Sequence, residues 1–134
     1  MAKVSDIEGI GPANEKKLND AGIKTVSGLL KMCCDKKGRK SVAEASGIDE
    51  SQLLKWANFA DLYRIKGVGS EYSELLEAAG VDTVKELRNR NAENLHAKMA
   101  EVNSAKKLVR QLPALSRVQD FVEQAKGLDP VITH

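Results

Sequence analysis

A duplicated segment constrains this chain more than any other feature of its sequence. Residues 7–29 read IEGIGPANEKKLNDAGIKTVSGL, and residues 65–87 read IKGVGSEYSELLEAAGVDTVKEL. The offset between matching positions is constant, because 67 minus 9, 80 minus 22 and 83 minus 25 all equal 58. The 134 residues therefore predict two repeats of about 58 residues each, rather than one irregular domain.

Both copies begin with the pattern apolar-x-Gly-apolar-Gly, and we call residues 7–11 and 65–69 the first and second glycine hairpins. Pro12 suits the first turn of a helix after the first hairpin, since its missing N–H would be unpaired there in any case. Ser70 stands at the matching place and is predicted as an N-cap. Gly22 and Gly80 are predicted to end the two helices with positive φ.

The rest of the chain also reads as short helices. Thr83-Val84-Lys85-Glu86 is a predicted capping box, and Asp49 and Ser116 are predicted to start two further helices in the same way. No convincing period-two strand is present, so the fold class is all-α with nine or ten short helices. We expect residues 1–63 to form the first repeat and residues 64–134 the second, rigidly joined by the helix around 50–64.

The second half of each repeat reads as a weaker helical hairpin. In the first repeat, Ser46-Gly47-Ile48 predicts a short turn between two helices. In the second repeat, Val102-Asn103 stands where that glycine turn is expected. Each repeat is thus predicted to hold one strong hairpin and one degenerate hairpin.

The glycine hairpins, each followed by a helix and a Gly-apolar-x-Thr-Val exit, resemble the helix-hairpin-helix motif. Nearly the whole chain, including the stretch LYRIKGVGSEYSELLEAAG and the later LVRQLPAL, further resembles an uncharacterised bacterial helix-hairpin-helix family of unknown function. The resemblance implies a tandem repeat of two helix-hairpin-helix units in a SAM-like bundle of short helices. It implies no established activity.

A tight hairpin of this kind needs glycine because a Cβ would block its backbone dihedrals, and glycine lets a ligand approach the main chain. The N-terminus of the following helix favours a phosphate through its free N–H groups and its dipole. In relatives that bind DNA, this geometry holds the backbone without reading bases, sometimes with a monovalent cation on the hairpin carbonyls; no other cofactor is expected. The resemblance implies phosphate contacts by the hairpins, their following amides and nearby lysines, namely Gly9, Ile10, Gly11, Ala13, Lys16, Lys17, Lys66, Gly67, Gly69 and the amide of Glu71.

The two hairpins depart differently from a DNA-binding pattern. After the first, Glu15 precedes Lys16 and Lys17, whereas the second is followed by Glu71 and Glu74 with no basic residue until Lys85. A carboxylate beside a phosphate is repulsive, so the second hairpin is predicted to bind more weakly, although Lys66 partly offsets this. The alternative interpretation is that both hairpins are only tight turns that let helices pack.

A basic cluster lies within the first repeat. Residues 36–40 carry four positive charges, on Lys36, Lys37, Arg39 and Lys40. We predict that they form a loop that contacts phosphate, and the alternative interpretation is an ordinary solvated loop. A second basic group, Lys106, Lys107 and Arg110, is interpreted as the exposed face of a helix. The aromatic residues Trp56, Phe59, Tyr63 and Tyr72 stand at helical spacing beside leucines and are interpreted as core.

Composition excludes several classes of protein. The 21 basic and 19 acidic residues give a net charge of only +2, so nucleic-acid binding must rest on local patches. No stretch predicts a membrane span or a signal peptide, and we expect a cytoplasmic protein that does not contact membranes. Cys33 and Cys34 cannot form a disulfide framework or a zinc site, and we interpret them as a helix end packed in the core.

Catalysis has little support in the sequence. Two isolated histidines and the absence of any nucleophile, phosphate-loop or metal pattern predict a protein that is not an enzyme, holds no metal and takes no small-molecule substrate. The leading hypothesis is a module that binds the backbone of nucleic acid, in particular double-stranded DNA, without sequence specificity. The alternative is an adaptor that binds a protein partner and has lost phosphate binding.

Overall fold

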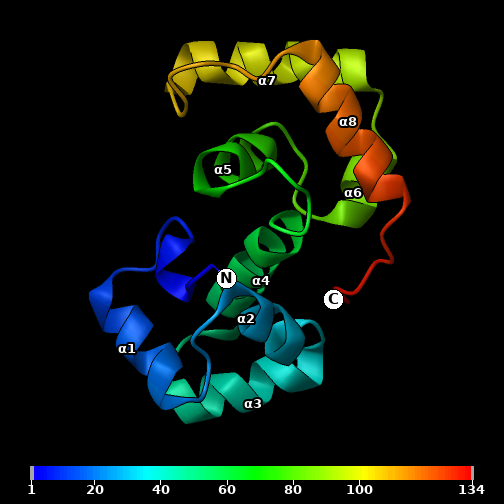
Figure 1. The fold of residues 1–134 in the computed structure, drawn as a ribbon. Coiled ribbons are helices and arrows are strands. Elements are labelled where there is room, and N and C mark those ends of the chain that lie inside the picture. The colour runs from blue at the N-terminus through cyan, green and yellow to red at the C-terminus, as the bar shows by residue number, and fades with distance from the viewer. Residues whose placement is uncertain (1, 134) are drawn as a thin grey trace. The chain divides into compact units, whose positions relative to one another are not determined.

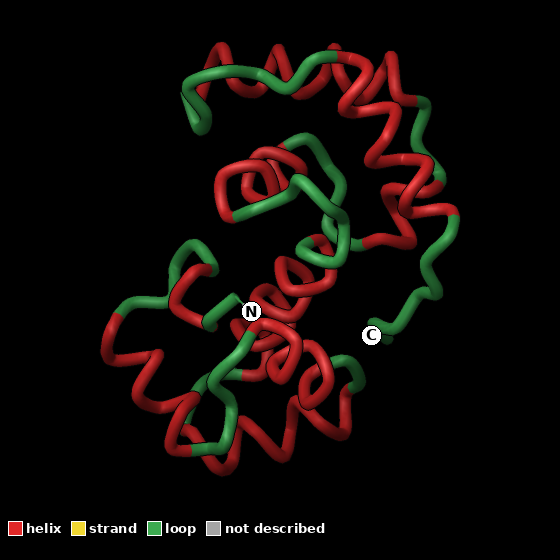
Figure 2. Tube along the Cα trace, viewed as in Figure 1, coloured by secondary structure: helices red, strands yellow, loops and turns green. Residues whose placement is uncertain are grey.

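A computed structural model describes residues 2–133, and within them the chain is helical (Figures 1 and 2). The elements in chain order are η1 (Val4–Asp6), α1 (Pro12–Asp20), α2 (Val26–Cys33), α3 (Lys36–Ser46), α4 (Glu50–Leu62), α5 (Ser70–Ala78), α6 (Val84–Arg88), α7 (Ala92–Lys106) and α8 (Leu115–Lys126). Over the described range, extended pairing is limited to an isolated antiparallel bridge between Lys3 and Thr25. The all-α fold class is confirmed.

The helices group into two compact units. The first extends to Asp61 and also includes the segment that begins at Val131, whereas the second comprises Leu62–Pro130. The first unit thus contains η1, α1 to α3 and nearly all of α4, and the second contains α5 to α8. No helix within residues 2–133 is both long enough and apolar enough to cross a lipid bilayer.

The two glycine hairpins have the same backbone conformation. Gly9 has φ +93° and Gly67 has φ +96°, so each takes the left-handed turn that favours glycine. The helices that follow, α1 and α5, both have nine residues and begin and end 58 positions apart. Gly22 and Gly80 then have φ +90° and +96°, which confirms their prediction as glycines that end helices.

The repeat continues beyond the hairpins with a change of register. Thr25 and Thr83 each cap the next helix through a side-chain oxygen, which accepts from the third residue of that helix. We call α4 and α8, the last helices of the two repeats, the closing helices. Between them the offset grows to 65, because Trp56 of α4 corresponds to Phe121 of α8, and both rings are at least 98% buried. The added length lies in α7, which has 15 residues against 11 in α3, and in the longer connection after it.

Each unit has an apolar core. In the first unit, Leu18, Ile23, Leu29, Leu53 and Trp56 are nearly or fully inaccessible. In the second, leucines, valines and Phe121 form one continuous cluster, against which the half-buried Tyr72 packs. The Tyr72 and Phe121 ring centroids lie 6.3 Å apart. Burial of Trp56 and Phe59 confirms that these aromatic residues belong to the core.

Three predicted helix starts or turns are wrong in detail. Ser70 is the first residue of α5 and Gly69 is its N-cap, so the serine does not cap the helix. The last helix begins at Leu115 after Ala114, without a capping side chain, rather than at Ser116. The helix of the second repeat continues through Val102-Asn103 and ends at Lys106, and the next residue, Lys107, takes the left-handed conformation of Gly47 in the first repeat.

The basic cluster of residues 36–40 is also placed differently from the prediction. It forms the first turns of α3 rather than a loop, because Asp35 caps the helix by accepting from the Gly38 N–H at 2.7 Å. The interpretation of Cys33 as the end of a helix packed in the core is confirmed, since it ends α2 and is fully buried.

Candidate functional site

The N-terminal turns of α1 and α5 lack a capping side chain, because Gly11 and Gly69 occupy the N-cap positions. Four other helices begin with a side chain that accepts a hydrogen bond from a backbone N–H of the first turn, and these residues are Thr25, Asp35, Thr83 and Asn91. The N–H groups at the start of α1 and α5 are therefore left to water or to a ligand. The positive end of the helix dipole adds to their attraction for an anion.

Folding does not require glycine at either N-cap. Gly11 and Gly69 have φ of −84° and −113°, values that any residue adopts. A Cβ built on either one meets nothing within 4 Å. A serine or an asparagine would fit there and would supply the missing cap. What glycine provides at both positions is open space above the helix N-terminus.

The other hairpin glycines, Gly9 and Gly67, are packed against the closing helix of their own unit. A Cβ on Gly9 would lie 3.6 Å from the Trp56 indole nitrogen, an ordinary contact. A Cβ on Gly67 would lie 2.8 Å from a guanidinium nitrogen of Arg117 and 3.2 Å from the Phe121 ring. Folding therefore needs glycine at these two positions for its left-handed φ, and at Gly67 also for close packing.

Helix α8 brings two polar side chains to the second hairpin. The Arg117 guanidinium lies next to Gly67 and stands 5.9 Å from the centroid of the Phe121 ring. The Gln124 amide brackets the Lys66 peptide: its oxygen accepts from the Lys66 N–H at 2.8 Å, and its nitrogen donates to the Lys66 carbonyl at 3.2 Å. The second hairpin is thus held in place and has two cations, exposed Lys66 and exposed Arg117.

A cavity of about 330 Å³ opens at the second hairpin. It is lined by Gly67, Gly69 and the first three residues of α5, including Glu71 and Tyr72. The backbone of the two glycines and the first residues of α5 thus border this space, and Glu71 is its acidic member. The sequence that follows this hairpin has no basic residue until Lys85, but in three dimensions Arg117 reaches the hairpin from α8.

At the first hairpin the predicted residues have mixed environments. Ile10 is 6% exposed and anchors the hairpin in the core, so only its backbone can face a ligand. Ala13 lies in the first turn of α1 and is exposed. Lys16 and Lys17 follow on the same helix with exposed side chains, and Glu15 is half-buried between them and the hairpin.

The basic cluster of α3 does not join the first hairpin. Figure 1 shows α3 beginning at the side of the first unit opposite the beginning of α1. Lys36, Lys37 and Lys40 are exposed there. Arg39 is 4% exposed and donates to the Cys33 carbonyl at 3.0 Å and to the Thr133 carbonyl at 2.7 Å. The sequence predicts that Arg39 contacts phosphate, but its buried guanidinium instead links two backbone carbonyls within the first unit.

No sequence pattern indicates that Arg117 and Gln124 contact the second hairpin. Each is separated from the hairpin by about fifty residues or more, and no local pattern links them. The sequence holds only an indirect signal, which is that the last helix of each repeat contains a large aromatic residue, Trp56 or Phe121, and both are buried in the structure.

Neither a metal site nor a reactive Cys33 thiol is found in the part of the chain that the structure describes. No group of three or more His, Cys, Asp and Glu side chains within residues 2–133 is placed to hold a metal ion. Burial raises the pKa of the Cys33 thiol to about 11, although the nearby Arg39 charge acts in the opposite direction. Cys33 is therefore protonated and unreactive at neutral pH.

Comparison with known proteins places the chain in a family. A family model described as a domain of unknown function (DUF4332) matches residues 8–128, so the chain belongs to that family. The match begins inside the first hairpin and ends just after α8, and it therefore covers both repeats. Neither a curated protein nor a solved structure matches the chain.

Proposed function

We propose that this protein binds the phosphate backbone of nucleic acid, with duplex DNA as its main ligand, and that it does so without catalysis or base recognition. In this proposal the two glycine hairpins with α1 and α5 are a tandem pair of helix-hairpin-helix motifs. Their shared backbone conformation and identical helix lengths support this interpretation.

The observation that carries the proposal is the glycine at the N-caps of α1 and α5. Folding does not explain Gly11 and Gly69, because both have ordinary φ and open space where a side chain would stand. Close approach of a ligand to the main chain does explain them. An anion suits the site best, since uncapped N–H groups and the helix dipole both face that space.

The charges around the hairpins favour a phosphate diester over a neutral ligand. Lys66 and Arg117 are exposed cations at the second hairpin, and Lys16 and Lys17 follow the first. Contacts from backbone N–H groups and flexible cations fix a protein on the nucleic-acid backbone but carry no sequence information. Binding is therefore expected to be independent of sequence and strongly dependent on salt.

The test is fluorescence anisotropy of a labelled DNA duplex titrated with the protein between about 50 and 200 mM salt. The wild-type protein should bind with log K falling linearly against log salt, by about 0.9 per phosphate contacted. The double variant Gly11→Ala/Gly69→Ala should bind about tenfold or more weakly, because each methyl group holds a phosphate away from its N–H donors. Its stability should fall by less than about 1 kcal/mol per site, since both N-caps accept alanine without steric conflict.

Gly127→Ala is the matched control, because it adds a methyl group at a negative φ at the end of α8. It should bind like wild type. Equal affinity of wild type and the double variant would remove the hairpins as the binding site. No binding of the wild-type protein at the lowest salt concentration would overturn the proposal and leave a protein partner as the alternative.

A further inference from the structure

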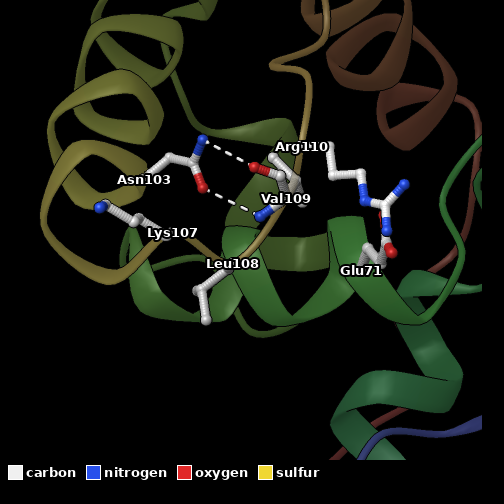
Figure 3. Close-up of a pocket in the computed structure, with 6 residues that line it drawn as sticks. All are labelled: Glu71, Asn103, Lys107, Leu108, Val109 and Arg110. Atoms are coloured by element: carbon white, nitrogen blue, oxygen red, sulfur yellow. Dashed lines mark hydrogen bonds between the residues drawn. The ribbon is translucent and has the colours of Figure 1, made fainter.

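A second cavity lies beside α5, where the chain leaves α7. Its volume is about 560 Å³, and it is lined by Glu71, Asn103, Lys107, Leu108, Val109 and Arg110. Figure 3 shows Lys107 and Arg110 at opposite ends of this group, with the Arg110 side chain extending over Glu71. The interpretation of Lys107 and Arg110 as the exposed face of a helix is wrong, because α7 ends at Lys106.

The loop that carries these cations has a fixed shape. The Asn103 side chain donates to the Val109 carbonyl at 3.1 Å and accepts from the Val109 N–H at 2.9 Å (Figure 3). Val109 is 7% exposed, and the half-buried Leu108 packs against the core of the second unit. Because the two residues between them are anchored, Lys107 and Arg110 are presented from a rigid turn rather than from a mobile loop.

Lys107 occupies this turn at a conformational cost. Among residues 2–133 it is the one non-glycine residue with positive φ, at +52°. The first repeat uses Gly47 for the same left-handed turn after α3. Glycine would satisfy the backbone of the second repeat more easily, so the lysine is not explained by the fold. A strained residue at the edge of a cavity points to a use for its charge.

The two cavities of the second unit share one residue. Glu71 lines the cavity at the second hairpin and also the cavity at Lys107 and Arg110. The surface therefore continues from the hairpin backbone across Glu71 to the two cations. The matching position in the first repeat, 58 residues earlier, is Ala13, so the carboxylate is particular to the second repeat.

We infer that Lys107 and Arg110 form a second phosphate site, in which each cation, at its own end of the cavity, contacts a phosphate of the nucleic-acid strand held by the second hairpin. This inference rests on the proposed function and extends it to a strand that crosses Glu71. Arg110 offers several N–H donors in a planar fork, and Lys107 adds a point charge. Glu71 opposes binding, because it faces both sites with a negative charge.

The first arm of the test removes the cations. Lys107→Gly keeps the left-handed turn and deletes the charge, and Arg110→Gln keeps a polar side chain of similar length. The double variant should bind a DNA duplex about tenfold more weakly than wild type, with the salt slope reduced by about 0.9 for each phosphate that the protein no longer neutralises. The control Lys85→Gln/Lys98→Gln removes the same net charge from the second unit at residues that line neither cavity, and it should change affinity much less.

The second arm removes the carboxylate. Glu71→Gln should raise affinity by about threefold or more, because Arg110 and the hairpin amides lose a competing negative charge. A gain of affinity cannot arise from partial unfolding, so this arm separates a binding effect from a structural one.

The outcomes distinguish this inference from the proposed function. Weaker binding by the cation variant together with tighter binding by Glu71→Gln supports the second site. Wild-type binding with a cation variant no weaker than its control overturns the second site and leaves the hairpin proposal intact. Failure of the wild-type protein to bind DNA overturns both.

Discussion

Replacement of Gly67 by alanine tests the packing of the second hairpin. Two costs are expected. A residue with a Cβ at φ +96° loses about 1–2 kcal/mol relative to glycine. The new methyl group would also lie 3.2 Å from the Phe121 ring, which is fully buried and has no room to retreat. Overpacking of this kind costs about 1–3 kcal/mol.

The Arg117 guanidinium, 2.8 Å from the same methyl position, adds little to the cost because it is the end of a long, exposed side chain. The expected loss for Gly67→Ala is therefore about 2–5 kcal/mol. Gly80→Ala is the matched control in the same unit, because Gly80 also has φ +96° but faces only the end of the Arg90 side chain. It should lose only the dihedral cost of about 1–2 kcal/mol.

Native-state hydrogen exchange of the buried α5 residues Leu75 and Leu76 would measure the free energy of opening of the second unit directly. Urea unfolding followed by circular dichroism would give the loss for the whole chain. If Gly67→Ala lost no more stability than Gly80→Ala, the closing helix could not be packed against the second hairpin as described, and the placement of Arg117 beside it would also be refuted.

Three further predictions concern side chains with internal roles. Arg39→Ala should destabilise the first unit by about 2–4 kcal/mol, because two carbonyls lose a charged donor, and the fluorescence of the single tryptophan would report it. At pH 8 a thiol reagent should modify Cys34 but not Cys33, whose pKa is about 11. Because this folded pKa lies above the unfolded value of 9.0, the stability that Cys33 contributes should decline as the pH rises from 9.0 to about 11. Unfolding titrations of wild type and Cys33→Ala over this pH range would show the decline. Asn103→Ala should cost about 1–3 kcal/mol and speed amide exchange at Val109, since both backbone groups of that residue lose their partner.

The features that the sequence predicts well are local ones. Positive φ at Gly22 and Gly80 follows from their place after a nine-residue helix, and Pro12 at the first helical position follows from its missing N–H. These effects act within a few residues, so short patterns are sufficient to identify them. The duplicated segment strengthens each prediction, because every pattern occurs twice.

The features that the sequence does not predict depend on distant partners. Arg39 stands in a run of lysines that reads as solvated, but its acceptor at Thr133 is 94 residues away. Arg117 reaches Gly67 only because α8 packs behind the second hairpin. Asp35 stands beside a run of charged residues, so the sequence does not single it out as a helix cap. Its side-chain oxygen accepts from the Gly38 N–H, and residues 36–40 therefore form the first turns of α3 rather than the predicted loop. No short-range periodicity contains this information.

The return of residues 131–133 to the first unit has a consequence for biosynthesis. The Thr133 N–H donates to the Cys34 carbonyl, and its own carbonyl accepts from Arg39, so the first unit is completed by residues that leave the ribosome after the whole second unit. Chains generally fold in the order in which they emerge. In this chain the buried Arg39 guanidinium has one acceptor, the Cys33 carbonyl, six residues away, but its second acceptor, the Thr133 carbonyl, is synthesised 94 residues later. We therefore expect the first unit to begin folding before the second and to gain the contacts of residues 131–133 only after the second has been synthesised.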